Sequence, residues 1–191
     1  MILQRHPKLN PKRIKDKNLN TDNYFGQEVL VPANNGYVAI SLAIALILNF
    51  LPLQDDLSIL RPDFVAITVA YWSINHPHKM GMSVAFGMGL LMDVGSASIL
   101  GQHALAYCVT VYLTLVFGRR LRLFSLIQQA PQIGLILFMM QIVIVLIAIS
   151  NDSNLPGWQY FLASVTGALL WVPASFLLSI PLKQKPDPDA L

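Results

Sequence analysis

Residues 133–150 read IGLILFMMQIVIVLIAIS, with no charged side chain and with Gln141 as the one polar residue before Ser150. The hydrocarbon core of a membrane takes a helix of about 20 such residues. Because backbone groups in lipid must find hydrogen bonds within their own segment, this continuous apolar run predicts a membrane-spanning helix. A barrel strand would instead alternate apolar and polar residues over about 10 positions.

Five other stretches of the chain are similarly long and apolar. They are residues 37–53, 59–75, 80–97, 101–118 and 159–181. Over the whole chain 54% of residues are hydrophobic and 12% are charged, and the mean hydropathy is +0.54. This composition excludes an ordinary soluble domain. The sequence therefore predicts an all-α polytopic membrane protein, in which residues 37–182 form a bundle of six transmembrane helices.

The basic residues predict how these six segments are oriented, because cytoplasmic loops are enriched in Lys and Arg. Of the thirteen Lys and Arg residues, only Arg61 falls on the second side of a six-span threading. The other twelve share the first side: Arg5, Lys8, Lys12, Arg13, Lys15, Lys17, Lys79, Arg119, Arg120, Arg122, Lys183 and Lys185. We therefore expect both termini to be cytoplasmic.

The two ends of the chain differ from the apolar segments. Residues 1–36 carry six basic and three acidic side chains and too few apolar ones to build a core, so we expect a disordered cytoplasmic arm. Its basic residues would be attracted to anionic lipids by about 1 kcal/mol each. The alternative is a docking segment for a cytoplasmic protein. Residues 183–191 form a short cytoplasmic tail.

The segment after the fourth apolar stretch, residues 118–129, has two interpretations. Its arginines stand at the start, and Leu123, Phe124 and Ile127 share one helical face, which suits a helix lying flat at the membrane interface. A plain loop is the alternative. In either case we expect the segment to stop at Pro131.

Small residues recur at four-residue spacing in the third apolar stretch. Gly81, Ala85 and Gly89 lie on one face of a helix, with Asp93 next in the same row. Small side chains at this spacing let another helix backbone approach closely. We predict a helix-packing seam, either within the bundle or with a partner.

Asp93 is an acidic residue inside an apolar stretch, where a carboxylate costs about 2.5–3.5 kcal/mol to insert. It should therefore face the bundle or a wet cavity. Two roles fit the sequence. Asp93 either caps the turn formed by residues 95–98, or it serves as a proton or substrate site.

The remaining polar residues form no recognisable catalytic group. His76 and His78 lack a third metal ligand, and no Ser or Thr stands at a known spacing from a base. No phosphate-binding glycine loop occurs, and the single cysteine, Cys108, is expected to be a packing residue. We predict that the chain is not an enzyme and has no cofactor, metal or nucleic-acid partner.

Several short motifs, in order, resemble the rod shape-determining protein MreD family of bacterial inner membranes. The resemblance runs from about residue 37 to 182 and leaves the arm uncovered. The motifs are Arg61-Pro62-Asp63-Phe64, Tyr71-Trp72, His76-Pro77-His78-Lys79-Met80-Gly81, Gly89-Leu90-Leu91-Met92-Asp93-Val94, Leu100-Gly101-Gln102-His103-Ala104-Leu105 and Arg119-Arg120-Leu121-Arg122-Leu123-Phe124.

The resemblance implies a non-enzymatic inner-membrane subunit of the elongation machinery, or elongasome, which maintains rod cell shape by scaffolding lateral peptidoglycan synthesis. It implies MreC, MreB, RodA and a class B penicillin-binding protein as partners. Arg61, Asp63, Asp93 and His103 are the candidate structural or partner-contact residues.

The same family is similar in its six-helix fold to the substrate-binding subunits of energy-coupling-factor transporters. The alternative function is therefore that of a vitamin-binding transporter subunit. A ligand pocket would need several convergent polar groups. The candidates are Asn49, Asp93, His103 and Gln141.

Reporter fusions test the predicted topology. Fusions after Asn20, Lys79, Arg122 and Lys185 should report the cytoplasm, because the basic residues beside them are retained there. Fusions near Asp56 and Ser153 should report the opposite side. A signal from the opposite side after Arg122 would contradict the six-span threading.

Overall fold

The computed structural model describes residues 34–52, 60–151 and 157–182, which all lie in one compact unit, Pro32–Leu182. The described residues form six α-helices and two short 3-10 helices, so the all-α prediction is confirmed. Apart from residues 34–36, the predicted arm and the tail lie outside the described residues. The helices are α2 (Asn35–Phe50), α4 (Phe64–Asn75), α5 (Met82–Gly95), α6 (Gln102–Leu121), α7 (Leu126–Ser150), η1 (Trp158–Phe161), α8 (Leu162–Ser179) and η2 (Ile180–Leu182).

Three helical segments of the described chain are long and apolar enough to cross a membrane, Gln102–Leu121, Leu126–Ser150 and Trp158–Leu182. The helices α2, α4 and α5 are apolar but shorter. A helix as short as α4 rises about 18 Å, less than the roughly 30 Å of a hydrocarbon core. The chain is a multi-pass membrane protein, and the count of six spans stays a prediction.

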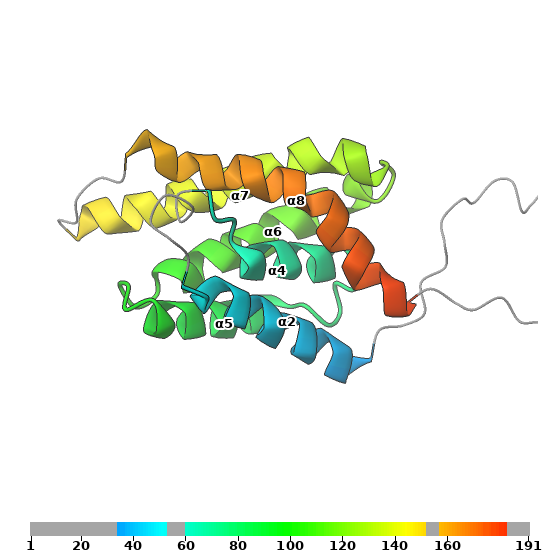
Figure 1. Ribbon diagram of the computed structural model, residues 1–191, viewed down its shortest axis with the longest axis horizontal. Coiled ribbons are helices and arrows are strands. Elements are labelled where there is room, and N and C mark those ends of the chain that lie inside the picture. The colour runs from blue at the N-terminus through cyan, green and yellow to red at the C-terminus, as the bar shows by residue number, and fades with distance from the viewer. Residues whose placement is uncertain (1–33, 53–59, 152–156, 183–191) are drawn as a thin grey trace, which may run out of the picture. The chain divides into compact units, whose positions relative to one another are not determined.

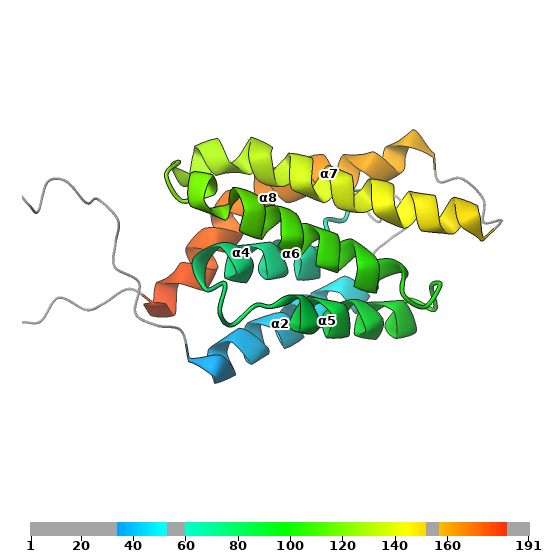
Figure 2. The same cartoon turned by 180° about the vertical axis from the view of Figure 1, so that it is seen from behind.

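Helices α4 and α6 form the centre of the bundle (Figures 1 and 2). Helix α6 packs against α4, α5 and α7, and α4 packs also against α2 and α8. Ten of the twelve residues of α4 are buried, so this helix has no face toward lipid. A helix enclosed in this way does not have to reach both membrane surfaces, because protein groups can satisfy its ends.

The outer helices present large apolar side chains to their surroundings. Ile47 is 64% exposed on α2, Leu146 57% on α7 and Leu169 72% on α8. A surface of this kind is unusual for a soluble monomer. It matches hydrocarbon instead, which agrees with the membrane assignment.

Two helix starts differ from the sequence expectations. Helix α4 begins at Phe64 rather than near residue 59, because Pro62 precedes Asp63 and Asp63 is the N-cap. Helix α7 begins at Leu126 and contains Pro131, so the expected stop at Pro131 is wrong. This proline lies in the second turn of α7. Because proline has no backbone N–H, the helix loses one hydrogen bond, to the carbonyl oxygen of Ile127 four residues earlier, and Ile127 is 75% exposed.

Of the two interpretations of residues 118–129, the interfacial helix is wrong, and the loop is confined to residues 122–125. Gly118 to Leu121 complete α6, and residues from Leu126 onward belong to α7. Ser125 and Gln128 form a capping box at the start of α7. The segment is therefore a tight connection between two long helices, with no separate interfacial helix.

Glycine allows α5 and α6 to pack closely. A Cβ atom added to Gly89 would overlap the backbone of Ala104, and Ala85 on the same face is fully buried. A Cβ atom on Gly81, in contrast, would meet nothing within 4 Å. Within the predicted seam, the close approach is therefore at Gly89 and not at Gly81.

A second glycine contact joins α7 and α8. A Cβ atom on Gly134 would lie 2.9 Å from the Cβ of Ala168, and one on Gly167 would lie 2.6 Å from the Cδ1 of Leu137. Lipid tails are as apolar as the side chains that they contact, so helix association in a membrane depends on this kind of close packing.

Substitution of Gly89 tests the contact between α5 and α6. Gly89→Leu should destabilise the protein by about 1–3 kcal/mol or more through overpacking, and Gly89→Ala should have a smaller effect of the same sign. Gly87→Leu is the matched control, since a Cβ there meets nothing within 4 Å. Thermal unfolding of the purified protein measures the difference. Equal midpoints for Gly89→Leu and Gly87→Leu would contradict the packing assignment.

Candidate functional site

Asp63 joins three helices at the end of the bundle where α2 finishes and α4 begins. As the N-cap of α4, its Oδ1 accepts a hydrogen bond from the backbone N of Ala66 at 2.9 Å. The same oxygen accepts from Asn49 Nδ2 at 2.8 Å, and Oδ2 accepts from the Tyr107 hydroxyl at 2.6 Å. Asn49 Oδ1 accepts in turn from the backbone N of Phe64 at 3.0 Å. These bonds hold α2 and α6 against the start of α4.

Asp93 makes a comparable connection between α5 and α6, and its side chain is buried. Its Oδ1 accepts from the backbone N and the ring Nδ1 of His103, both at 2.8 Å, and from Ser98 Oγ at 3.1 Å. Its Oδ2 accepts from the backbone N of Gly101 at 2.8 Å. The first N–H groups of a helix lack partners within the helix and favour negative charge. The carboxylate thus reaches past the expected turn to the start of α6, which supports a structural role.

Arg61 and Asp63, paired in the sequence as one candidate corner, have different surroundings. Arg61 donates from Nη2 to the backbone oxygen of Leu48. Its Nε atom is buried and has no hydrogen-bond partner. Within the described ranges the one ion pair is that of His103 with Asp93, so the guanidinium is not neutralised by Asp63.

A polar cavity of about 220 Å³ opens at this end of the bundle. Three of the four residues named as pocket candidates, Asn49, His103 and Gln141, line it. The fourth, Asp93, is held against His103. The structure therefore brings together polar residues from α2, α5, α6 and α7 that the sequence alone could not place side by side.

The sequence analysis missed two tyrosines of this region. Tyr107 follows His103 by one helical turn and so shares its face of α6, a spacing that could have indicated it. Tyr160 lines the cavity, and its backbone oxygen accepts from Gln141 Nε2 at 3.3 Å. No pattern in the sequence placed Tyr160 at a polar cavity, because the contact joins η1 to α7 across a connection.

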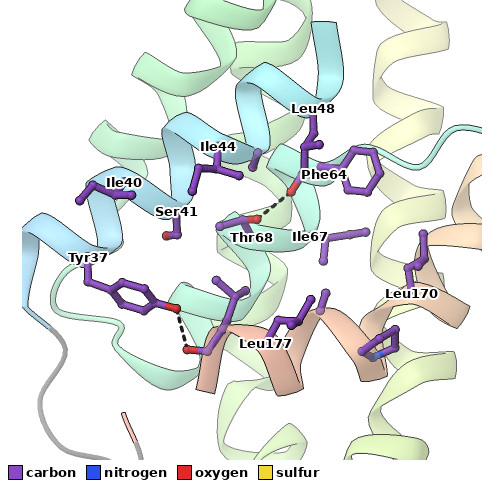
Figure 3. A pocket seen from close by; sticks show the side chains of 14 residues that line it. Tyr37, Ile40, Ser41, Ile44, Leu48, Phe64, Ile67, Thr68, Leu170 and Leu177 are labelled. Atoms are coloured by element: carbon purple, nitrogen blue, oxygen red, sulfur yellow. Dashed lines mark hydrogen bonds between the residues drawn. The ribbon is translucent and has the colours of Figure 1, made fainter. Parts of the chain in front are cut away.

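A second, apolar groove of about 310 Å³ lies between α2, α4 and α8 (Figure 3). Its hydroxyl groups bond to backbone oxygens: Tyr37 donates to Leu178 at 3.2 Å, Ser41 to Val38 at 2.7 Å and Thr68 to Phe64 at 2.8 Å. The remaining wall is aliphatic and aromatic. The groove thus offers hydrocarbon contact and no polar chemistry.

His76, one of the two histidines considered as metal ligands, ends α4 as its C-cap. Its ring lies 5.5 Å from that of Trp72. Burial lowers the pKa of His76, and the nearby charges of Lys79 and Arg122 lower it further. The imidazole is therefore neutral at pH 7 and packs as an aromatic side chain.

Substitutions of Asp93 test how much the hydrogen bonds of its carboxylate contribute to the stability of the protein. Asp93→Asn keeps one accepting oxygen but places an amide nitrogen, which cannot accept, next to hydrogen-bond donors. We therefore expect the free energy of unfolding to fall by about 1–3 kcal/mol. Asp93→Leu leaves every donor unsatisfied and should lose more. Ser98→Ala, which removes one of several donors, is the mild control. Thermal unfolding should rank the variants in this order, and a fully stable Asp93→Leu would contradict the capping role.

Comparison with known proteins follows this geometry. The family model described as rod shape-determining protein MreD matches residues 33–180. The chain is 30% identical over 142 residues to the rod shape-determining protein MreD of Haemophilus influenzae, an alignment that covers 74% of this chain and 87% of the relative. No solved structure matches the chain. Since the family match covers most of the sequence, this chain belongs to the MreD family of non-enzymatic, rod shape-determining membrane proteins.

Proposed function

We propose that the chain is an inner-membrane scaffold subunit of the bacterial elongation machinery, which maintains rod shape by holding lateral peptidoglycan synthesis enzymes in register. The observation that carries this proposal is the family match over residues 33–180. Membership of the MreD family places the chain in the elongasome context and confirms both the resemblance and the non-enzymatic prediction. The partners proposed are MreC, MreB, RodA and a class B penicillin-binding protein.

The geometry of the bundle supports a role without turnover. The carboxylates of Asp63 and Asp93 accept several hydrogen bonds each from other helices and loops. Acceptors engaged in this way are poor candidates for a general base, since proton transfer needs a group within reach of a substrate. Partner contact at the Arg61–Asp63 corner would therefore depend on Arg61, because Asp63 is occupied.

The proposed topology places both termini in the cytoplasm. Lys79 Nζ donates to Asn35 Oδ1 at 2.6 Å, so the start of α2 and the connection after α4 lie at one end of the bundle. This agrees with the assignment of the basic residues around them to one side. The Asp63 and Asp93 networks then lie at the periplasmic end. The basic arm, residues 1–36, is proposed to contact anionic lipids.

The alternative, a vitamin-binding subunit of an energy-coupling-factor transporter, has one observation in its favour. A polar cavity does exist, and three of the predicted pocket residues line it. Its volume of about 220 Å³ is below the roughly 300–1,000 Å³ of typical small-molecule pockets. We therefore rank the scaffold function first.

Depletion and complementation in a rod-shaped bacterium test the proposal. Loss of the protein should produce rounded cells, and the wild-type chain should restore rods. Normal rods with a vitamin requirement would contradict the scaffold function and support the transporter alternative.

The Asp93→Asn variant extends this experiment. If Asp93 has a structural role, the variant should restore rods wherever its protein level is normal. Rounded cells at a normal protein level would instead indicate that the charge of Asp93 takes part in function. Immunoblotting in parallel gives the protein level.

A further inference from the structure

Two residues that line the 220 Å³ cavity each have a buried polar atom without a hydrogen-bond partner among the described residues. One is a donor, Nε of Arg61, and the other is an acceptor, Oε1 of Gln141. Gln141 is only 5% exposed. A buried polar atom left unsatisfied costs about 1–3 kcal/mol, more for a charged group, so two in one cavity require an explanation.

Several other polar groups of the cavity are already engaged. Asn49 and Asp63 bond to each other at 2.8 Å. The ring Nδ1 of His103 is held by Asp93 at 2.8 Å, which leaves its Nε2 as the free nitrogen. The open positions thus include a guanidinium, an amide oxygen and an imidazole nitrogen.

We propose that this cavity binds a small anionic oxygen group, a phosphate or carboxylate, that carries a hydroxyl group close by. The anionic oxygen would accept from the Arg61 guanidinium, which pairs well with such groups in a planar geometry. The hydroxyl would donate to Gln141 Oε1. The site goes beyond the proposed function, which names protein partners and no small-molecule ligand.

The charges around the cavity permit an anion. No carboxylate lies within ion-pair distance of Arg61 in the part of the chain that the structure describes. The nearest acid in sequence, Asp63, accepts from the Tyr107 hydroxyl, from Asn49 and from a backbone N–H. Its negative charge is thus already stabilised by donors, whereas the guanidinium has an unused N–H.

The size of the cavity limits the ligand. Water takes about 30 Å³ per molecule in the liquid, so 220 Å³ has room for a phosphate with a few attached atoms. Such a group has two sources: a free solute such as glycerol 3-phosphate, or the phosphoglycerol head group of an anionic lipid. Both carry the phosphate and the hydroxyl that the two unsatisfied atoms require.

Thermal unfolding of the full chain in a neutral detergent tests the site. Glycerol 3-phosphate, phosphatidylglycerol and phosphatidylcholine are titrated at constant ionic strength. Phosphatidylcholine supplies a phosphate without a hydroxyl or a net charge. A ligand that binds the folded state raises the midpoint, and we expect a rise of about 3 °C or more with at least one of the first two. A rise with phosphatidylglycerol alone identifies the lipid as the source.

Variants test whether the rise in the unfolding midpoint depends on Arg61 and Gln141. Gln141→Met and Arg61→Gln should each abolish most of it, whereas Gln132→Met should retain it. Gln132 is the matched control because it lies on the same helix outside the cavity lining, and its side chain donates to the exposed backbone oxygen of Gln128. If Arg61→Gln does not accumulate, Gln141→Met decides alone.

Three outcomes would overturn the proposal. They are no rise with either hydroxyl-bearing phosphate, an equal rise with phosphatidylcholine, or a rise that Gln141→Met leaves unchanged. Depletion and complementation measure cell shape independently, so failure here leaves the proposed scaffold function standing.

Discussion

The hydrogen bonds that carboxylates make to helix starts organise this bundle. A helix N-terminus has N–H groups without partners inside the helix, and hydrocarbon offers none. Asp63 supplies an acceptor at the start of α4 and Asp93 at the start of α6. Each carboxylate needs donors in its turn, which come from Asn49 and Tyr107 for one and from Ser98 and His103 for the other. The requirement thus extends from the starts of α4 and α6 to α2 and to the connection between α5 and α6.

This arrangement explains why polar residues gather at one end of the bundle. Asn49, His103 and Gln141 come from three different helices, yet all line one cavity beside the two acidic networks. At the opposite end, Trp72 donates from its indole to Ser41 at 2.9 Å and Trp171 donates to Gln129 at 3.3 Å. Those bonds hold α2 against α4 and α7 against α8 with uncharged groups, whereas carboxylates make the corresponding contacts at the other end.

Between the two ends, close packing holds the helices together. Gly89 admits the backbone of α6, and Gly134 with Gly167 brings α7 against α8. In lipid there is no hydrophobic driving force between helices, so their association depends on close packing. Glycine has no side chain and therefore lets the helices approach at these positions. The framework that results is closely packed inside and apolar on its outer faces, which suits a multi-pass membrane protein.

The sequence by itself determined the all-α class, the membrane location and the family, and it indicated that Asp93 and Gly89 lie at helix contacts. These follow from composition, apolar length, ordered motifs and four-residue spacing, which are all local properties. It did not determine that α4 begins only at Phe64 or that α7 continues through Pro131. Whether a residue caps a helix, and whether a helix can contain a proline, depends on the neighbouring groups in the folded structure.

Only the tertiary structure decided that Asn49 and Tyr107 meet at Asp63 and that Gln141, with an unsatisfied oxygen, lines the same cavity as Arg61. Those contacts join helices far apart in the sequence, and their geometry is set by packing rather than by any repeat along the chain.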